Sequence, residues 1–229
     1  MRDKQKIRVK SVSSIVACHA CPVRYQLMKS QETTEPERYT IAKQLSYALG
    51  RPLDASALWE DIRLIAPEIA GENKELLEAW VRACRESEWD MADEYDVRVT
   101  SDALGIGGTI DRILPGSPPR CAIMRMTEAP DAGVWGADRI RAACLAVCIE
   151  ETLGFTPSAI ICEYLPSGIA RPCIPEPRDR RRALQAIRTA DAIDKGMVPR
   201  KPRNAPCEGC FLAEVCTVSG PKKLGDLFK

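Results

Sequence analysis

Three cysteines lie close together near the C-terminus, where the segment PCEGCFLAEVC holds Cys207, Cys210 and Cys216. Their spacing, C-x2-C-x5-C, is too compact and too irregular for a pattern of packed core residues. Clustered thiolates are typical of a zinc ion or an iron–sulfur cluster, and each needs a fourth ligand. The best candidate is Cys21 in ACHACPVRY, far away in the sequence. We therefore expect a metal centre that ties the two ends of the domain together, with a set of ordinary free thiols as the alternative.

The other seven of the eleven cysteines have the surroundings of core residues, in which a free thiol behaves as a small hydrophobe. The count is odd and the N-terminal segment MRDKQKIRVK is charged, so the disulfide framework of a secreted protein is not expected. No stretch approaches the ~20 apolar residues of a membrane span. We expect a reducing compartment, the cytoplasm, and no membrane partner. These seven cysteines are Cys84, Cys144, Cys148 and Cys162 in apolar runs, Cys121 and Cys173 at strand-like positions, and Cys18.

Charge is distributed unevenly along the chain, although the formal net charge is only +1. Residues 1–30 and 171–229 each carry a net charge of +6, whereas residues 31–170 carry −11. If the cysteines join the two ends, this positive charge gathers on one side, where it could bind the phosphates of DNA. Charges scattered over unrelated surfaces are the alternative. The side chains expected to contact phosphates are Arg178, Arg180, Arg181, Arg182, Arg200, Lys201 and Arg203.

The hydrophobic pattern predicts helices first and strands later. Apolar residues recur at three- and four-residue steps in 54–65 and 73–86, and 12–30 has the pattern of a helix that opens at Ser13 or Ser14 and is interrupted by Pro22. The period then changes to the alternation typical of strands. This order predicts one mixed α/β domain around a central sheet. The later elements expected are the strands EYDVRVTSD, GIGGTIDRIL and CAIMRM, a helix from about Ala137 to Leu153, the strands SAIICEYL and GIARPCIP, and a basic helix over 178–195.

Four segments resemble those of the CRISPR-associated Cas-four nucleases, which are relatives of the RecB nuclease domain. SSIVACHACPVRYQL resembles the family's opening motif S-x-I-x-x-Y-x-x-C-P-x-x-Y, with Cys21 at the first cluster cysteine and Cys18 at the tyrosine. GIGGTIDRIL resembles the strand that carries the metal-binding aspartate, here Asp111. GADRIRAACLAVCIEETLG resembles the helix after the active-site strands, and PCEGCFLAEVC has the spacing of the closing cysteine motif.

The resemblance runs from about Ser13 to Cys216 and implies the RecB-like PD-(D/E)XK nuclease fold, a central mixed β-sheet flanked by helices. It implies a single domain, 1–229, with a helical insertion at about 31–90, a nuclease-like core at about 91–196 and a cysteine segment at 197–220. It also implies a 4Fe–4S cluster bound by Cys21, Cys207, Cys210 and Cys216. The alternative is zinc, with His19 replacing a cysteine in a Cys₃His site.

The catalytic positions of this family are altered in the chain. The second carboxylate and the lysine of the family's E-x-K motif fall on Met124 and Met126, and a thioether cannot hold hard Mg²⁺ or Mn²⁺. Arg141 stands at the glutamine of the family's Q-x-x-x-Y/Q motif, with Leu145 at its second polar position. The family's active-site histidine is absent as well, since the only histidine is His19. Asp111 is therefore expected to be a catalytic remnant, held by nearby amides, and bound Mg²⁺ or Mn²⁺ is not expected.

Glu128 has the strand parity of Met124 but lies four residues on, roughly 13 Å away along a strand, so it could share a metal with Asp111 only if the strand ends and folds back. The function predicted from the resemblance is a non-catalytic Cas-four-like iron–sulfur scaffold. It would bind DNA or a protein partner such as a Cas-one-type integrase during CRISPR spacer acquisition. The alternatives are an active metal-dependent exonuclease on single-stranded DNA, and an iron–sulfur subunit of an unrelated assembly.

Overall fold

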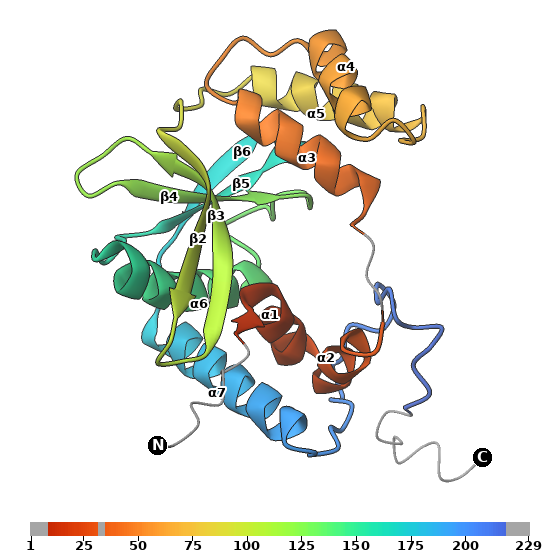
Figure 1. Ribbon diagram of the computed structural model, residues 1–229, viewed down its shortest axis with the longest axis vertical. Coiled ribbons are helices and arrows are strands. Elements are labelled where there is room, and N and C mark those ends of the chain that lie inside the picture. The colour runs from red at the N-terminus through yellow and green to blue at the C-terminus, as the bar shows by residue number, and fades with distance from the viewer. Residues whose placement is uncertain (1–8, 32–34, 219–229) are drawn as a thin grey trace, which may run out of the picture.

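The computed structural model describes residues 9–31 and 35–218 of the chain. A six-stranded mixed sheet forms its centre, and helices cover both faces of the sheet (Figure 1). The predicted α/β class, with a central mixed sheet flanked by helices, is confirmed. Within the described ranges, no helix is both long and apolar enough to cross a bilayer.

Every helix and strand predicted from the hydrophobic pattern is present, and three further elements, β1, α3 and the short η1, were not predicted. The order is β1 (Lys10–Ser11), α1 (Val12–Ala20), α2 (Pro22–Met28), α3 (Glu37–Ala48), α4 (Ala55–Ile65), α5 (Asn73–Arg85), β2 (Glu94–Ser101), β3 (Ile106–Leu114), β4 (Arg120–Arg125), α6 (Gly136–Leu153), β5 (Ile160–Tyr164), the 3₁₀ turn η1 (Leu165–Ser167), β6 (Ile169–Cys173) and α7 (Pro177–Asp194).

Strand β3 is the centre of the sheet, and one of its edges is only partly paired. Along one edge β3 pairs antiparallel with β2. Along the other, β1 pairs parallel with Ile106 and Gly107, and β4 pairs antiparallel with the stretch from Arg112 to Leu114. Between them, residues 108–111 have no strand partner on that edge among the described residues. Strands β5 and β6 continue the sheet beyond β4.

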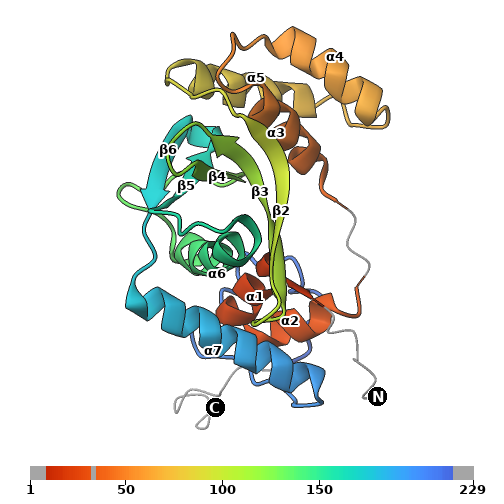
Figure 2. The ribbon, with the colours of Figure 1, turned by 60° about the vertical axis from the view of Figure 1, so that its left-hand side comes forward.

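Two hydrophobic clusters fill the two sides of the sheet. One is formed by inward-facing strand residues together with α1, α6 and α7, and it includes the buried thiols of Cys144, Cys148 and Cys162. The other lies under α3, α4 and α5 and is built around Leu45, Trp80 and their neighbours. The turned view in Figure 2 shows α3–α5 at one end of the molecule, α1 and α7 at the other, and α6 beside the strands between them. The predicted core thiols are therefore buried as expected.

Cys21 stands between two helices because Pro22 separates them. Helix α1 ends at Ala20, and Pro22 is the first residue of α2. A proline disfavours the helical conformation in the residue before it, and Cys21 accordingly has extended φ and ψ of −159° and 112°. At the other end of α1, the cap is Ser11, whose side chain accepts a hydrogen bond from the Ser14 N–H at 3.0 Å. The predicted start at Ser13 or Ser14 was therefore wrong, because the serine that caps the helix lies further upstream.

A buried arginine fastens the helices α3–α5 to the sheet. Arg112 of β3 is 0% exposed and its Nη1 lies 2.6 Å from Oε1 of Glu163 on β5. Its Nη2 donates to the backbone carbonyls of Leu49, which follows α3, and Asp90, which precedes β2. A buried charge is tolerated only when it is paired and hydrogen-bonded, so these contacts fix where the helical segment meets the sheet.

Candidate functional site

A cavity of about 490 Å³ opens where the edge of β3 has no strand partner. Gly108, Thr109 and Asp111 line it from β3, and the chain leaving β1 lines it with Ser11, Val12 and Ser13. Residues of β4, α6 and α3 complete the wall, so five separate segments of the chain bound the cavity. Asp111, the expected catalytic remnant, lines it together with the three altered catalytic positions, Met124, Met126 and Arg141.

The carboxylate of Asp111 is fully engaged by groups of the protein. Its Oδ1 lies 2.7 Å from Nζ of Lys43, and its Oδ2 accepts the Met124 N–H at 2.8 Å. The second bond satisfies a backbone donor at the point where β3 and β4 stop pairing. The side chains of Asp111 and Lys43 are 12% and 11% exposed, so the ion pair is largely shielded from water. Asp111 therefore has a structural role, because its carboxylate links β3 to β4 and α3.

Lys43 of α3 bridges two aspartates. Its ammonium contacts Asp96 of β2 as well as Asp111, and the Tyr47 hydroxyl donates to the second oxygen of Asp96. Burial alone would lower the pKa of Lys43, but the two carboxylates outweigh it and raise that pKa above its ordinary value. Asp96 has a left-handed backbone, with φ of 55°, a conformation that aspartate tolerates better than most residues. A cation is thus already present beside Asp111, and it belongs to the protein.

The two methionines at the altered catalytic positions pack against the helices. Met124 is 7% exposed and is part of the hydrophobic cluster under α3–α5, and Met126 packs against the same cluster. The predicted strand CAIMRM included Met126. Strand β4 instead ends at Arg125, so Met126 lies just past it. Thioethers are poor ligands for Mg²⁺ and Mn²⁺, and Asp111 is the only carboxylate among the described residues that line this cavity.

Two arginines line the same cavity. Arg125 lies with its Nε 2.7 Å from Oδ1 of Asp138, a fully buried carboxylate whose other oxygen accepts the Tyr164 hydroxyl at 2.8 Å. Arg141 of α6 donates from Nη1 to the Ser13 hydroxyl at 2.9 Å. Arg141 is half-buried, and desolvation of its guanidinium, together with the like charge of Arg125, lowers its pKa to about 10.

Glu128 does not reach this cavity. The strand ends before it, and the exposed Glu128 is held through its backbone carbonyl, which accepts the Trp135 Nε1–H at 2.7 Å. The fold back toward Asp111 that would bring a second carboxylate into play does not occur. A metal site made of Asp111 and Glu128 is therefore not formed.

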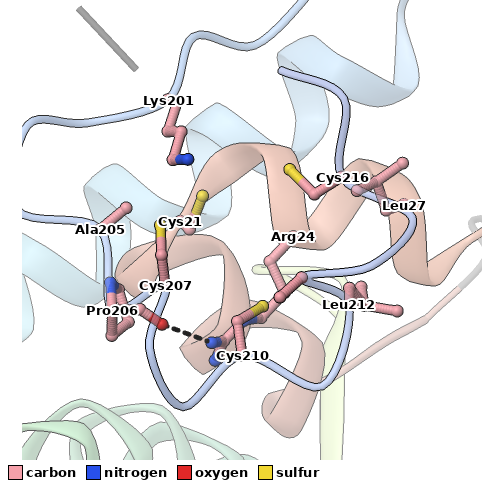
Figure 3. Close-up of a pocket in the computed structure, with 11 residues that line it drawn as sticks. Cys21, Arg24, Leu27, Lys201, Ala205, Pro206, Cys207, Cys210, Leu212 and Cys216 are labelled. Atoms are coloured by element: carbon pink, nitrogen blue, oxygen red, sulfur yellow. Dashed lines mark hydrogen bonds between the residues drawn. The ribbon is translucent and has the colours of Figure 1, made fainter. Parts of the chain in front are cut away.

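The four cysteines predicted as metal ligands line a second cavity, of about 80 Å³ (Figure 3). Cys21 reaches it from the break between α1 and α2, and Cys207, Cys210 and Cys216 reach it from the C-terminal segment. Arg24 and Lys201 line the cavity too, and Arg24 holds the segment by donating from Nη2 to the Pro206 carbonyl at 3.4 Å. The two ends of the domain thus meet around the thiols.

Two cationic side chains favour the thiolate form at this cavity. Burial opposes ionisation of Cys210, but the Leu212 N–H and the nearby Arg24 outweigh it and lower the pKa of that thiol. A hydrogen bond with Cys207 raises the pKa of Lys201. Metal centres bind thiolates rather than thiols, so this environment suits them.

Within the described residues, the thiols are not grouped closely enough for a single metal ion. Tetrahedral zinc with bonds of ~2.3 Å brings its sulfur ligands to roughly 3.8 Å from each other. No three of the described histidine, cysteine, aspartate and glutamate side chains are grouped closely enough to hold an ion. The exposed His19 does not line the cavity, so the Cys₃His arrangement is not formed either. By number and type alone, four thiols would suit a tetrahedral zinc ion or a 4Fe–4S cluster alike.

The basic side chains predicted to bind phosphates lie mostly on the surface. Arg180, Arg181 and Arg182 are exposed on α7, and Arg200 and Arg203 are exposed in the C-terminal segment. Arg182 lies close enough to His19 to add to the effect of burial in lowering the pKa of that imidazole, and Lys201 faces Cys21. Both basic segments thus reach the corner between α1 and α2. Part of the positive charge predicted for the two ends lies in 1–8 and 219–229, outside the described residues.

Arg178 differs from its neighbours because acidic side chains partly neutralise it. Its Nε lies 3.0 Å from Oε2 of Glu176, which caps α7 together with Asp179. Arg139 also binds Asp179, at 2.6 Å. Glu176 and the buried Asp179 thus place negative charge at the N-terminus of α7, where it interacts favourably with the positive end of the helix dipole.

Lys43, Asp96 and Tyr39 were missed as site residues. Lys43 and Tyr39 lie on α3, which was not predicted, although Ile41, Leu45 and Leu49 recur at four-residue steps and are all buried. That spacing was the available signal for the helix. Nothing in the sequence pairs Lys43 with Asp111, because the contact depends on how α3 packs over the sheet.

No protein-family model matches the chain, and no curated protein matches it. Among solved structures, it is similar to a crystal structure from Eubacterium rectale described as a "Putative exonuclease", with a TM-score of 0.59. The match covers 96% of this chain and 93% of the other, at 14% sequence identity. The fold is nuclease-like. At this identity the similarity concerns the fold alone, and it extends over nearly the whole chain.

Proposed function

We propose that this chain is a Cas-four-like iron–sulfur protein that retains a nuclease-like fold and does not cleave nucleic acid. Its role would be that of a scaffold that binds DNA and a protein partner, such as a Cas-one-type integrase in CRISPR spacer acquisition. The single observation that carries the proposal is the ion pair between Asp111 and Lys43. It places a protein cation against the one carboxylate that the altered site retains.

Metal-dependent cleavage of a phosphodiester requires carboxylates that hold a divalent cation against the phosphate. Here Asp111 is neutralised by Lys43, and the neighbouring positions are filled by the side chains of Met124 and Met126. To bind a cation, Asp111 would have to release Lys43 and the Met124 N–H. The largely buried ammonium and the backbone N–H would then each lose a hydrogen-bond partner. The free energy of that exchange opposes metal binding, since buried polar groups are costly without partners.

For the cysteine cavity, we propose that Cys21, Cys207, Cys210 and Cys216 hold a 4Fe–4S cluster. The support is that four thiols from both ends of the domain line one cavity beside Arg24 and Lys201. The cluster would act there as a structural link. Because its ligands come from distant segments, its binding free energy would add to the stability of the whole fold.

The proposal is tested by incubating single-stranded and double-stranded DNA with the purified protein and Mg²⁺ or Mn²⁺. We expect no cleavage by the wild type and no difference on Asp111→Ala. A matched variant should restore cation binding by combining Met124→Glu and Met126→Lys with Lys43→Met, because Lys43 would otherwise occupy both carboxylates. Calorimetric titration with Mn²⁺ measures that gain. Robust wild-type cleavage that disappears in Asp111→Ala would instead establish an active exonuclease.

A further inference from the structure

Arg141 differs from the other cations around the cavity at β3 because it has no carboxylate partner among the described residues. Lys43 is bound by Asp96 and Asp111, and Arg125 by Asp138. Arg141 donates from Nη1 to the neutral Ser13 hydroxyl, and its buried Nε has no hydrogen-bond partner within the described part of the chain. Holding a partly desolvated guanidinium without a negative partner costs free energy, and a bound anion would offset that cost.

The part of the cavity wall next to Arg141 also favours an anion. Helix α1 begins there, and its cap Ser11 lines the cavity together with Val12 and Ser13 of its first turn. The N–H groups of a first helical turn point away from the helix body and carry partial positive charge, which is why phosphates bind at helix N-termini. No acidic side chain lies in that first turn. Arg141 and the start of α1 are joined through the Arg141–Ser13 hydrogen bond, so both act on the same part of the cavity.

We propose that this cavity binds a phosphate group directly, without a divalent cation, with Arg141 and the first turn of α1 as its ligands. This inference rests on the proposed function, in which the phosphate would be the terminal phosphate of a nucleic-acid strand. Arginine suits this task because its planar guanidinium can present two N–H donors to phosphate oxygens. The volume of about 490 Å³ leaves room for a nucleotide, and the ring of Tyr39 on the cavity wall offers a surface for a base.

In this interpretation the altered catalytic positions acquire a common purpose. Lys43 cancels the negative charge of Asp111 that would otherwise repel a phosphate in the absence of metal. Met124 and Met126 remove the further carboxylate and the lysine that belong to a hydrolytic site. Arg141 then supplies the positive charge that a divalent cation would bring, without the activated water that cleaves the bond.

The experiment compares three single-stranded oligonucleotides of one sequence, with a 5′-phosphate, a 3′-phosphate or hydroxyls at both ends. Binding is measured by fluorescence anisotropy in EDTA with an internal dye. We expect the wild type to prefer one phosphorylated end by roughly tenfold or more, as a charge-assisted hydrogen bond provides. Arg141→Gln should abolish the preference. Arg82→Gln, an exposed arginine on α5, should retain it.

Because Arg141→Gln could perturb folding, Ser13→Asp provides an independent test. A carboxylate in the first turn of α1 favours the helix dipole, so this variant should melt no lower than the wild type. It gives Arg141 an internal anion and should therefore also abolish the end preference. Retention of the preference in a folded Ser13→Asp variant would overturn the proposal.

The remaining outcomes separate this inference from the proposed function. Equal binding of all three oligonucleotides by the wild type, or a preference that appears only with Mn²⁺, refutes the phosphate site while leaving DNA binding intact. Protection against thermal unfolding by inorganic phosphate or a deoxynucleoside monophosphate is then measured on the same variants. Protection that depends on Arg141, without binding of any oligonucleotide, would support the phosphate site and contradict the DNA-binding role.

Discussion

Replacement of Asp111 by alanine distinguishes a structural aspartate from a catalytic one through the sign of its effect on stability. A carboxylate kept for metal binding is commonly a burden on the fold, so its removal leaves stability unchanged or raises it. Asp111 instead accepts two hydrogen bonds, from Lys43 at 2.7 Å and from the Met124 N–H at 2.8 Å, in a site that is 9% exposed. We therefore expect Asp111→Ala to destabilise the protein.

The magnitude follows from the groups left without partners. Loss of one member of a buried ion pair costs about 3–5 kcal/mol, and an unsatisfied buried N–H costs about 1–3 kcal/mol. Lys43 keeps Asp96 as a partner, which reduces the first contribution. A decrease of about 2–4 kcal/mol in the free energy of unfolding is the result we expect. For a domain of this size that lowers Tm by roughly 5–15 °C.

Urea denaturation followed by tryptophan fluorescence measures this change. Asp61→Ala, on the exposed face of α4, is the matched control and should stay within about 0.5 kcal/mol of the wild type. A double-mutant cycle with Lys43→Met should give a coupling energy above about 1 kcal/mol, because the two side chains are in contact. If Asp111→Ala is as stable as the wild type and shows no coupling, the structural role of Asp111 is refuted.

Three further predictions concern the cysteine cavity and two buried carboxylates. Cys216→Ala should lower Tm markedly and remove the brown colour and roughly four irons per chain of anaerobically purified protein; a colourless wild type with stoichiometric zinc would contradict the cluster. Burial raises the pKa of Glu163 to about 7 despite Arg112, so its contribution to stability is present below pH 4.5 and is lost as the pH rises through about 7. Between pH 5 and 8, the free energy of unfolding should depend less on pH in Glu163→Gln than in the wild type. The same slope in both proteins would contradict this. Although burial opposes it, Arg139 and the Glu176 N–H lower the pKa of Asp179, so its contribution is present above pH 3.8 and is lost as the pH falls further. Asp179→Asn should be less stable at pH 7, with a gentler loss in acid; stability equal to the wild type at pH 7 would argue against it.

The order of helices and strands could be predicted because local patterns determine it. The apolar stripe of α5 and the alternation in β2 match the period of each element, and Pro22 marks the break that places Cys21. The buried thiols of β4–β6 and α6 could be predicted for the same reason. Helix α3 was not predicted because polar residues between its apolar positions weaken the hydrophobic pattern. Its stability depends on packing against α4, α5 and the sheet, which no local pattern records.

The candidate site could be predicted only as a set of positions. The sequence indicated that Asp111 remains while the residues at Met124, Met126 and Arg141 are altered, and the structure places all four on one cavity. It did not indicate Lys43, whose contact with Asp111 is made across 68 residues. Ion pairs between distant segments depend on the packing angle of whole elements, and no local pattern records them.

The cysteine cavity also has a consequence for biosynthesis. Cys21 leaves the ribosome early, while Cys207, Cys210 and Cys216 follow only after about 190 further residues. At translation rates of roughly 5–20 residues per second, the first thiol waits about ten to forty seconds for the others. Whatever the four thiols bind can be captured only by a chain translated to its last cysteine. Under the proposed cluster, a chain that terminates before Cys216 would lack one ligand and could not form the link between its two ends.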